Sequence, residues 1–141
     1  MSKPTKTIEF RFERTIPAPP GVVFQAWLNP KVPGNPWNMA DKLILQPKVD
    51  GMFYWAIKGT AHYGRFTEVA PPDRIEHTWV SPHTLGEESK VTVSFEKKGD
   101  NTLMTLVHSD LPDTDGGRGH EKGWNYFLGI FPEQFSDVRR T

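Results

Sequence analysis

The stretch Ser89–Ser109, SKVTVSFEKKGDNTLMTLVHS, contains two strand-like runs with a turn between them. In the first run, Ser89–Glu96, apolar and polar side chains alternate, which is the pattern of a strand with one buried face. Lys98–Asn101 has the composition of a turn, and Thr102–Ser109 leads the chain back. The stretch therefore predicts a long antiparallel hairpin.

Five segments upstream of this hairpin also have the pattern of strands. Their connections contain glycine or proline, as at Gly59 and at Pro71-Pro72-Asp73. After the first strand, prolines precede a short amphipathic helix over Val22–Leu28. A loop follows over Lys31–Asn38, which admits at most another helical turn around Trp37 and Met39. The predicted strands are Thr7–Arg14, Leu43–Pro47, Met52–Lys58, Ala61–Val69 and Arg74–Trp79.

The last segment of the chain changes to the period of a helix, with large apolar residues recurring at intervals of three and four. Asp113 or Asp115 is placed to cap the start of this helix. Pro132 lacks an amide proton and predicts a kink, or a division into two pieces, near Gly129. The apolar stripe consists of Trp124, Phe127, Leu128, Phe131, Phe135 and Val138.

Together these elements predict an α+β fold. Consecutive strands joined by short turns form an antiparallel sheet, and a long helix with one apolar stripe needs a sheet to lie on. A curved sheet wrapped around the C-terminal helix, with short helices after the first strand, satisfies both requirements. With 141 residues, 16.1 kDa and no internal repeat or linker, we expect a single domain over residues 1–141.

Composition excludes several classes of protein. Cysteine is absent, which excludes a disulfide scaffold, a thiol nucleophile and cysteine-ligated zinc. The 17 basic residues balance the 17 acidic ones, so we expect no nucleic-acid partner and no binding to anionic lipid. The N-terminal sequence lacks the apolar run of a signal peptide, and no segment is long enough to span a bilayer. We therefore expect a cytoplasmic protein without membrane insertion.

A series of short motifs runs along the chain: Ala18-Pro19-Pro20 with VFQAW at Val23–Trp27, GMFYW at Gly51–Trp55, GRFTEV at Gly64–Val69, PPDRIEHTW at Pro71–Trp79, His108, and Gly123-Trp124. In order and spacing they resemble the START-like (SRPBCC) superfamily. Within it, the chain is most similar to domains named after the activator of the ninety-kilodalton heat-shock-protein ATPase. The resemblance extends from Thr7 to Phe135, and Pro132 and the PWNM segment at Pro36–Met39 depart from it.

This resemblance implies a helix-grip fold, in which a bent antiparallel sheet grips the C-terminal helix and often leaves an apolar cavity. The functions it implies are diverse. Members include lipid carriers, hormone receptors, polyketide cyclases, antibiotic-sequestering proteins and co-chaperone domains, so the fold alone gives only a range of classes.

Aromatic residues make up 12% of the chain, so large rings account for much of the expected burial. They either fill the core or line an apolar cavity. His77 and His108 lie on apolar faces, where each is either a satisfied structural histidine or a group that contacts a ligand oxygen or acts as a general base. The predicted ligand-binding residues are Trp37, Phe53, Trp55, Phe66, His77, Trp79, Met104, His108, Trp124 and Phe127.

The sequence indicates no metal site and no cofactor. We expect Glu68 to be an exposed charge paired with Arg65 or Arg74. The DTDGGRG segment at Asp113–Gly119 lacks the register of a calcium or phosphate loop and reads as a hinge before the last helix. His120 opens that helix, where it could cap a cavity mouth. None of the histidines has a local ligand spacing; they are His62, His77, His83, His108 and His120.

Three functions fit these observations. We favour binding of a small hydrophobic or aromatic molecule in a cavity between the sheet and the last helix. An alternative is an enzyme resembling polyketide cyclases or hydrolases, with a cavity histidine as general acid or base, although the sequence leaves open whether any reaction is catalysed. The resemblance implies a third function, a chaperone-associated interaction domain with a chaperone as partner. We expect a monomer or a homodimer.

Overall fold

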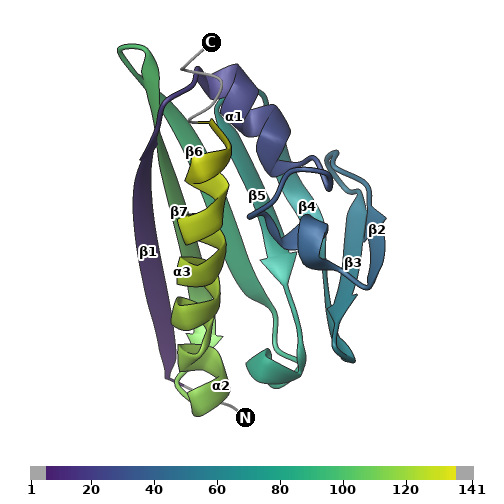
Figure 1. Ribbon diagram of the computed structural model, residues 1–141. Coiled ribbons are helices and arrows are strands. Elements are labelled where there is room, and N and C mark those ends of the chain that lie inside the picture. The colour runs from purple at the N-terminus through teal and green to yellow at the C-terminus, as the bar shows by residue number, and fades with distance from the viewer. Residues whose placement is uncertain (1–5, 136–141) are drawn as a thin grey trace.

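The computed structural model describes residues 6–135, and its main feature is one seven-stranded antiparallel sheet (Figure 1). The strands follow one another in space in the order β1-β7-β6-β5-β4-β3-β2. Every neighbouring pair except β1 and β7 is therefore consecutive in the chain. The strands are β1 (Thr7–Ile16), β2 (Lys42–Leu45), β3 (Met52–Ile57), β4 (Thr60–Ala70), β5 (Arg74–Trp79), β6 (Ser89–Lys98) and β7 (Asn101–Pro112).

The predicted strands and the predicted hairpin are confirmed. Strands β6 and β7 pair from Lys90 opposite Ser109 to Lys98 opposite Asn101, as the alternation in this stretch indicated. Strand β7 is longer than expected because its far end pairs with β1, where Thr7 lies opposite Pro112. This pairing joins the first and last strands and leaves β2 as the opposite edge of the sheet.

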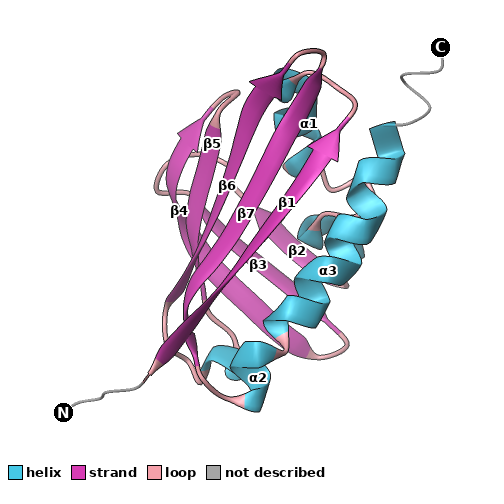
Figure 2. Ribbon diagram, turned by 90° about the vertical axis from the view of Figure 1, so that its left-hand side faces the viewer, coloured by secondary structure: helices cyan, strands magenta, loops and turns pink. Residues whose placement is uncertain are grey.

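Helix α3 (His120–Ile130) lies along the inner face of the sheet, beside β1 and β7 (Figures 1 and 2). Its residues Trp124 and Leu128 are buried, as the predicted stripe requires. At Phe131 the α-helix gives way to the 3₁₀ helix η3 (Phe131–Phe135). The change adjoins Pro132, which cannot donate a backbone hydrogen bond, so the predicted break is present. Val138, the last residue of the stripe, lies outside the described residues.

The predicted cap of this helix is wrong. A separate short helix, α2 (Asp115–Arg118), precedes α3, and the side chain of Thr114 accepts a hydrogen bond from the Gly117 amide. Asp113 and Asp115 instead bind the guanidinium of Arg118. Thr114 takes the capping role because its hydroxyl lies within reach of the first free amides of the turn.

Helix α1 (Pro20–Trp27) packs against β6 and β7, and the 3₁₀ helix η1 (Pro36–Met39) packs against β3. The Asn35 amide holds the loop between them, because its Nδ2 donates to the carbonyls of Ala26 and Asn29. The Trp37 indole donates to the Trp27 carbonyl at 3.0 Å. The PWNM segment that departs from the family pattern is therefore part of the core.

Gly64 in β4 allows a close approach between strands. A Cβ atom at this position would lie 2.1 Å from the Thr78 carbonyl oxygen, a distance that no side chain tolerates. The glycine therefore lets the sheet bend tightly here. Within residues 6–135, no helix has the length and apolar character needed to cross a membrane.

Candidate ligand-binding cleft

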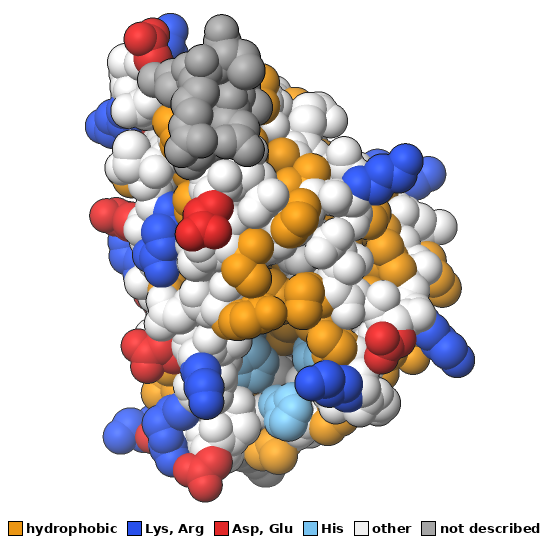
Figure 3. Space-filling view, viewed as in Figure 1, with side chains coloured by type: hydrophobic (Ala, Val, Ile, Leu, Met, Phe, Trp, Pro, Cys, Tyr) orange, Lys and Arg blue, Asp and Glu red, His pale blue; other side chains and the backbone are white. Residues whose placement is uncertain are grey.

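A cleft of about 560 Å³ opens between α3, the inner face of β3–β5 and the 3₁₀ helix η2 (Pro82–Thr84). In the space-filling view it is a hollow beside α3, bordered by hydrophobic and histidine side chains (Figure 3). The volume lies in the range typical of small-molecule sites. Its lining residues are Met39, Trp55, Ile57, His62, Trp79, His83, Asp115, Gly116, Gly119, His120, Lys122, Gly123, Trp124, Tyr126 and Phe127.

Four aromatic rings form a continuous wall of this cleft. The ring centroids of Trp55 and Trp79 are 5.8 Å apart, and those of Trp79 and Trp124 are 5.3 Å apart. The ring centroid of Phe127 lies 5.8 Å from that of Trp124 and 6.3 Å from that of Trp55, so the four rings contact one another in a closed ring. These are ordinary distances for tilted and edge-on aromatic contacts. Strands β3 and β5 and helix α3 therefore jointly present one apolar surface to the cleft.

The ten predicted ligand-binding residues separate into two groups. Trp55, Trp79, Trp124 and Phe127 line the cleft. The other six lie in the packed interior behind it, each no more than 2% exposed. Alternation along a strand identifies the inward face but cannot say which inward side chains face a void, so the sequence did not separate the groups. The six are Trp37, Phe53, Phe66, His77, Met104 and His108.

His77 lies at the centre of an aromatic cluster rather than at a surface. The rings of Trp37, Phe53 and Phe66 lie 6.0, 4.9 and 5.3 Å from its ring. Its Nδ1 donates to the Thr78 carbonyl at 2.9 Å. Burial lowers the pKa of His77 to about 4, so the ring is neutral at pH 7. This environment is that of a structural histidine.

His108 joins α3 to the sheet through two hydrogen bonds. The Trp124 indole donates to His108 Nδ1 at 2.9 Å, so the ring proton is on Nε2. Nε2 then donates to Ser89 Oγ at 2.8 Å, and that hydroxyl donates to the Trp79 carbonyl. Burial, reinforced by His120 and His77, lowers the pKa of His108 well below its usual value. With both nitrogens engaged, His108 orients a cleft residue and has no lone pair free for a general base.

His120 accepts a hydrogen bond from the Trp79 indole and so orients this ring, as His108 orients Trp124. The Trp79 indole lies 3.3 Å from His120 Nε2, and His120 Nδ1 donates to the carbonyls of Gly116 and Gly117. Burial lowers the pKa of His120, which again favours the neutral ring. His120 lines the cleft, as its place at the start of the last helix suggested. Two of the three indoles in the wall are therefore fixed by histidines.

Two further histidines in the lining were not among the predicted site residues. His62 in β4 lies opposite Trp55 in β3, and the two rings stack at 4.1 Å with an interplanar angle of 9°. Burial, followed by the neighbouring His120 and His83, lowers the pKa of His62 to about 4. His62 shares the inward face of β4 with Gly64 and Phe66, so strand alternation could have indicated it. His83 is exposed and comes from η2, where the sequence carried no such signal.

Three glycines in and between the last two helices border the cleft. Gly116, Gly119 and Gly123 all belong to its lining. A Cβ atom at Gly123 would have no neighbour within 4 Å, because this face of α3 borders the open cleft. Glycine at this position lowers the intrinsic stability of the helix and leaves space for the cleft.

Other candidates from the sequence have structural roles. Glu68 pairs with Arg74 at 2.7 Å on the surface, as expected. Asp113 and Asp115 are held by Arg118, which fixes the segment before α3. Within residues 6–135, no three side chains of the types that bind metals are grouped closely enough to hold an ion.

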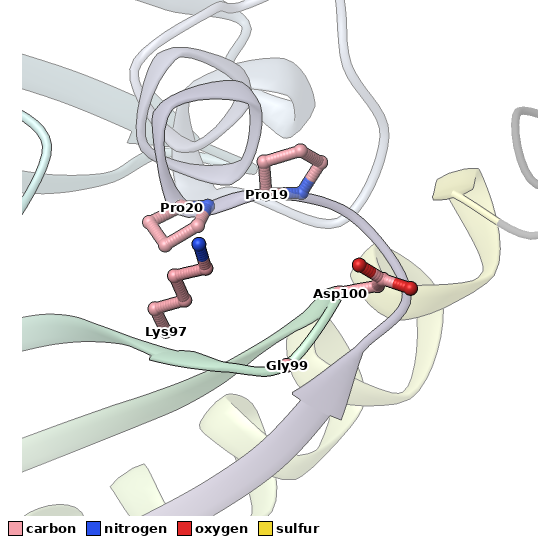
Figure 4. Close-up of a pocket in the computed structure, with 5 residues that line it drawn as sticks. All are labelled: Pro19, Pro20, Lys97, Gly99 and Asp100. Atoms are coloured by element: carbon pink, nitrogen blue, oxygen red, sulfur yellow. The ribbon is translucent and has the colours of Figure 1, made fainter.

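A second recess, of about 390 Å³, lies between the start of α1 and the β6–β7 turn (Figure 4). Lys97 points toward Pro20 at the helix start, and Asp100 points away from it. Pro19 and Gly99 complete the lining. Unlike the cleft, this recess has no aromatic wall.

The curved sheet, the gripped C-terminal helix and the apolar cleft between them define a domain of the helix-grip class. The chain belongs to the family of Activator of Hsp90 ATPase homolog 1-like proteins, whose sequence model matches residues 17–135. The resemblance deduced from the sequence motifs is thereby confirmed.

Three solved structures illustrate how widely the fold is shared. A protein from Chromobacterium violaceum is 20% identical, with a TM-score of 0.75 over 90% of this chain and 96% of that chain. A protein from Mesorhizobium loti is also 20% identical, with a TM-score of 0.75 over 95% and 98%. An HSP90 activator from Plasmodium falciparum is 24% identical, with a TM-score of 0.70 over 86% and 91%. At these identities the likeness establishes the fold alone. No curated protein sequence matches significantly.

Proposed function

We propose that the protein binds a small, largely apolar molecule with aromatic rings in the cleft between α3 and β3–β5. The observation that carries this proposal is the wall formed by Trp55, Trp79, Trp124 and Phe127 around about 560 Å³ of space. An apolar molecule that fills a concave void bordered by large rings displaces water from apolar surface, which is favourable.

The fixed orientation of the wall supports this proposal. His108 and His120 hold the indoles of Trp124 and Trp79, so these rings do not have to be ordered when a ligand arrives. A preformed site loses less conformational entropy on binding than a flexible one. Membership of a superfamily that often retains a cavity beside the helix points in the same direction.

The proposal is tested by a substitution at Gly123 whose larger side chain would occupy part of the cleft. In Gly123→Leu the new side chain enters open space on a helix that tolerates it, so we expect a folded protein with weakened ligand binding. Native mass spectrometry of the purified wild-type protein would first identify a bound molecule. Titration followed by tryptophan fluorescence would then give the affinity, because three of the five tryptophans line the cleft.

Gly129→Leu is the matched control, because Gly129 lies on the same helix, is exposed and also has no neighbour within 4 Å of a Cβ atom. It is not part of the cleft lining. We expect Gly123→Leu to weaken binding by about tenfold or more, corresponding to about 1.4 kcal/mol, while Gly129→Leu binds like the wild type. Equal affinities in all three proteins would rule out the cleft as the binding site.

A second candidate function is association with a chaperone, favoured by the family match and by the structural likeness to an HSP90 activator. In that case the outer surface rather than the cleft would carry the function. The test is the ATPase rate of the chaperone with and without this protein. A stimulation that persists in Gly123→Leu would assign the activity to the surface.

A further inference from the structure

Two side-chain nitrogens at the cleft wall lack hydrogen-bond partners. Trp55 Nε1 and His62 Nδ1 are both shielded from solvent, and within residues 6–135 no other buried side-chain nitrogen or oxygen is unpartnered. Backbone groups of Trp55 and Thr60 near the His62 ring raise its pKa, but burial lowers it by more. Buried polar groups of folded proteins are nearly always paired, so two neighbouring exceptions in a binding cleft call for a functional reason.

The other indoles of the same wall show what is missing at Trp55. Trp79 donates to His120 and Trp124 donates to His108, so each has an acceptor within the protein. Trp55 has a histidine beside it too, but His62 stacks flat on the indole at 4.1 Å instead of meeting its edge. Strand pairing fixes this arrangement, because Trp55 and His62 lie directly opposite each other. The third indole N–H is therefore left without an internal acceptor.

We propose that the ligand of the cleft is an aromatic molecule that carries an acceptor oxygen, and that Trp55 Nε1 donates to this oxygen. This inference rests on the proposed function and specifies its ligand class. An indole N–H can only donate, so the ligand must supply the acceptor. A neutral imidazole has one donor and one acceptor nitrogen. His62 can therefore form a hydrogen bond with either a donor or an acceptor atom of the ligand.

Neighbouring residues are compatible with such a ligand. Asp115 is the carboxylate of the lining, and Arg118 binds it, so its charge is compensated. Lys122 and His83 add donor groups to the lining. The ring of Phe127, half-buried and 6.3 Å from Trp55, packs edge-on against the indole. Because Trp55 Nε1 is shielded from solvent, a ligand oxygen reaches it only when side chains of the lining move, and the new hydrogen bond offsets the cost of this movement.

The test compares two ligands of nearly equal size, 2-acetylnaphthalene and 2-ethylnaphthalene, of which only the first has an acceptor oxygen. Nitrogen-15 NMR resolves an indole N–H signal for each tryptophan, and Trp55→Phe assigns the signal of Trp55. We expect the ketone to bind about tenfold more tightly than the hydrocarbon. We also expect the ketone to move the Trp55 signal downfield, whereas both ligands shift the signals of Trp79 and Trp124 through ring contacts.

The outcomes separate this inference from the proposed function. If both ligands shift the cleft signals and bind with equal affinity, the acceptor assignment is wrong and the cleft remains a binding site. If neither ligand shifts the signals of Trp55, Trp79 or Trp124, the proposed function fails and the inference fails with it. In Trp55→Phe the preference for the ketone should disappear. Should that variant not fold, the two ligands on the wild-type protein still decide the matter.

Discussion

At the residue scale, the most informative contact is the hydrogen bond between Trp124 and His108. It links a ring that faces the cleft to a histidine that is fully buried behind it. Buried polar groups rigidify a structure when all of them are satisfied and destabilise it when one loses its partner. The shape of the cleft wall therefore depends on a residue that does not touch the cleft.

This dependence gives a prediction for His108→Leu, a change that keeps the bulk of the side chain but removes the acceptor of the Trp124 indole. We expect the free energy of unfolding to fall by about 2 kcal/mol, because a buried donor is left unpaired. Urea denaturation would measure it. His83→Leu is the control, because His83 is exposed and should change stability by less than about 0.5 kcal/mol. Equal stability of both variants would refute the role assigned to His108.

At the scale of elements, the glycines of the last two helices have opposite roles. Gly117 in α2 lies so close to Pro112 that an added Cβ atom would be 1.8 Å from its carbonyl oxygen. Gly129 in α3 has open space around it. The close contact allows α2 to pack on the end of β7, whereas no packing requirement explains the glycine at position 129.

The same substitution should therefore have opposite effects at these two positions. Gly129→Ala should raise the free energy of unfolding by up to about 1 kcal/mol, since alanine is the better helix former. Gly117→Ala should lower it by about 2 kcal/mol or more, because the backbone must shift to avoid the clash. Thermal unfolding followed by circular dichroism compares the two. A stable Gly117→Ala protein would mean that α2 can move away from β7 without cost.

At the scale of the whole molecule, the buried histidines couple folding to pH. Burial lowers the pKa of His62 and His77 from 6.5 to about 4 and that of His108 well below 6.5. Below pH 6.5 the unfolded chain takes up protons at these positions, whereas the folded protein takes them up at His62 and His77 only near pH 4 and at His108 only well below pH 6.5. The unfolded state thus binds more protons in this window, and stability rises with pH.

We expect the free energy of unfolding to be constant above about pH 7 and to fall as the pH decreases from 6.5 toward 5. The slope should reach up to about 1.4 kcal/mol per pH unit for each of these histidines. Urea titrations at several pH values between 5 and 7.5 would measure it. His62→Phe removes one titrating group and should give a shallower slope. A flat profile across this range would contradict the neutral buried histidines.

The sequence by itself determined the order of the strands along the chain, the hairpin from Ser89 to Ser109, the last helix and its break beside Pro132. These features depend on alternation, helical period and proline chemistry, which are local properties of the chain. Family motifs added the helix-grip class. The cap of α2 at Thr114 was missed because threonine and aspartate are both common N-cap residues. Only the local geometry shows which of them caps the helix.

Only the tertiary structure decided which inward-facing rings line a void. Trp55 and Phe53 both face the sheet interior, yet Trp55 borders the cleft and Phe53 packs beneath η1. Likewise, His108 faces inward as predicted, but both of its ring nitrogens form hydrogen bonds, one with Trp124 and one with Ser89. Burial follows from periodicity along one strand, whereas a cavity depends on how distant elements fit together. That fit is set by side chains from β3, β5 and α3 at once, and no single segment of sequence encodes it.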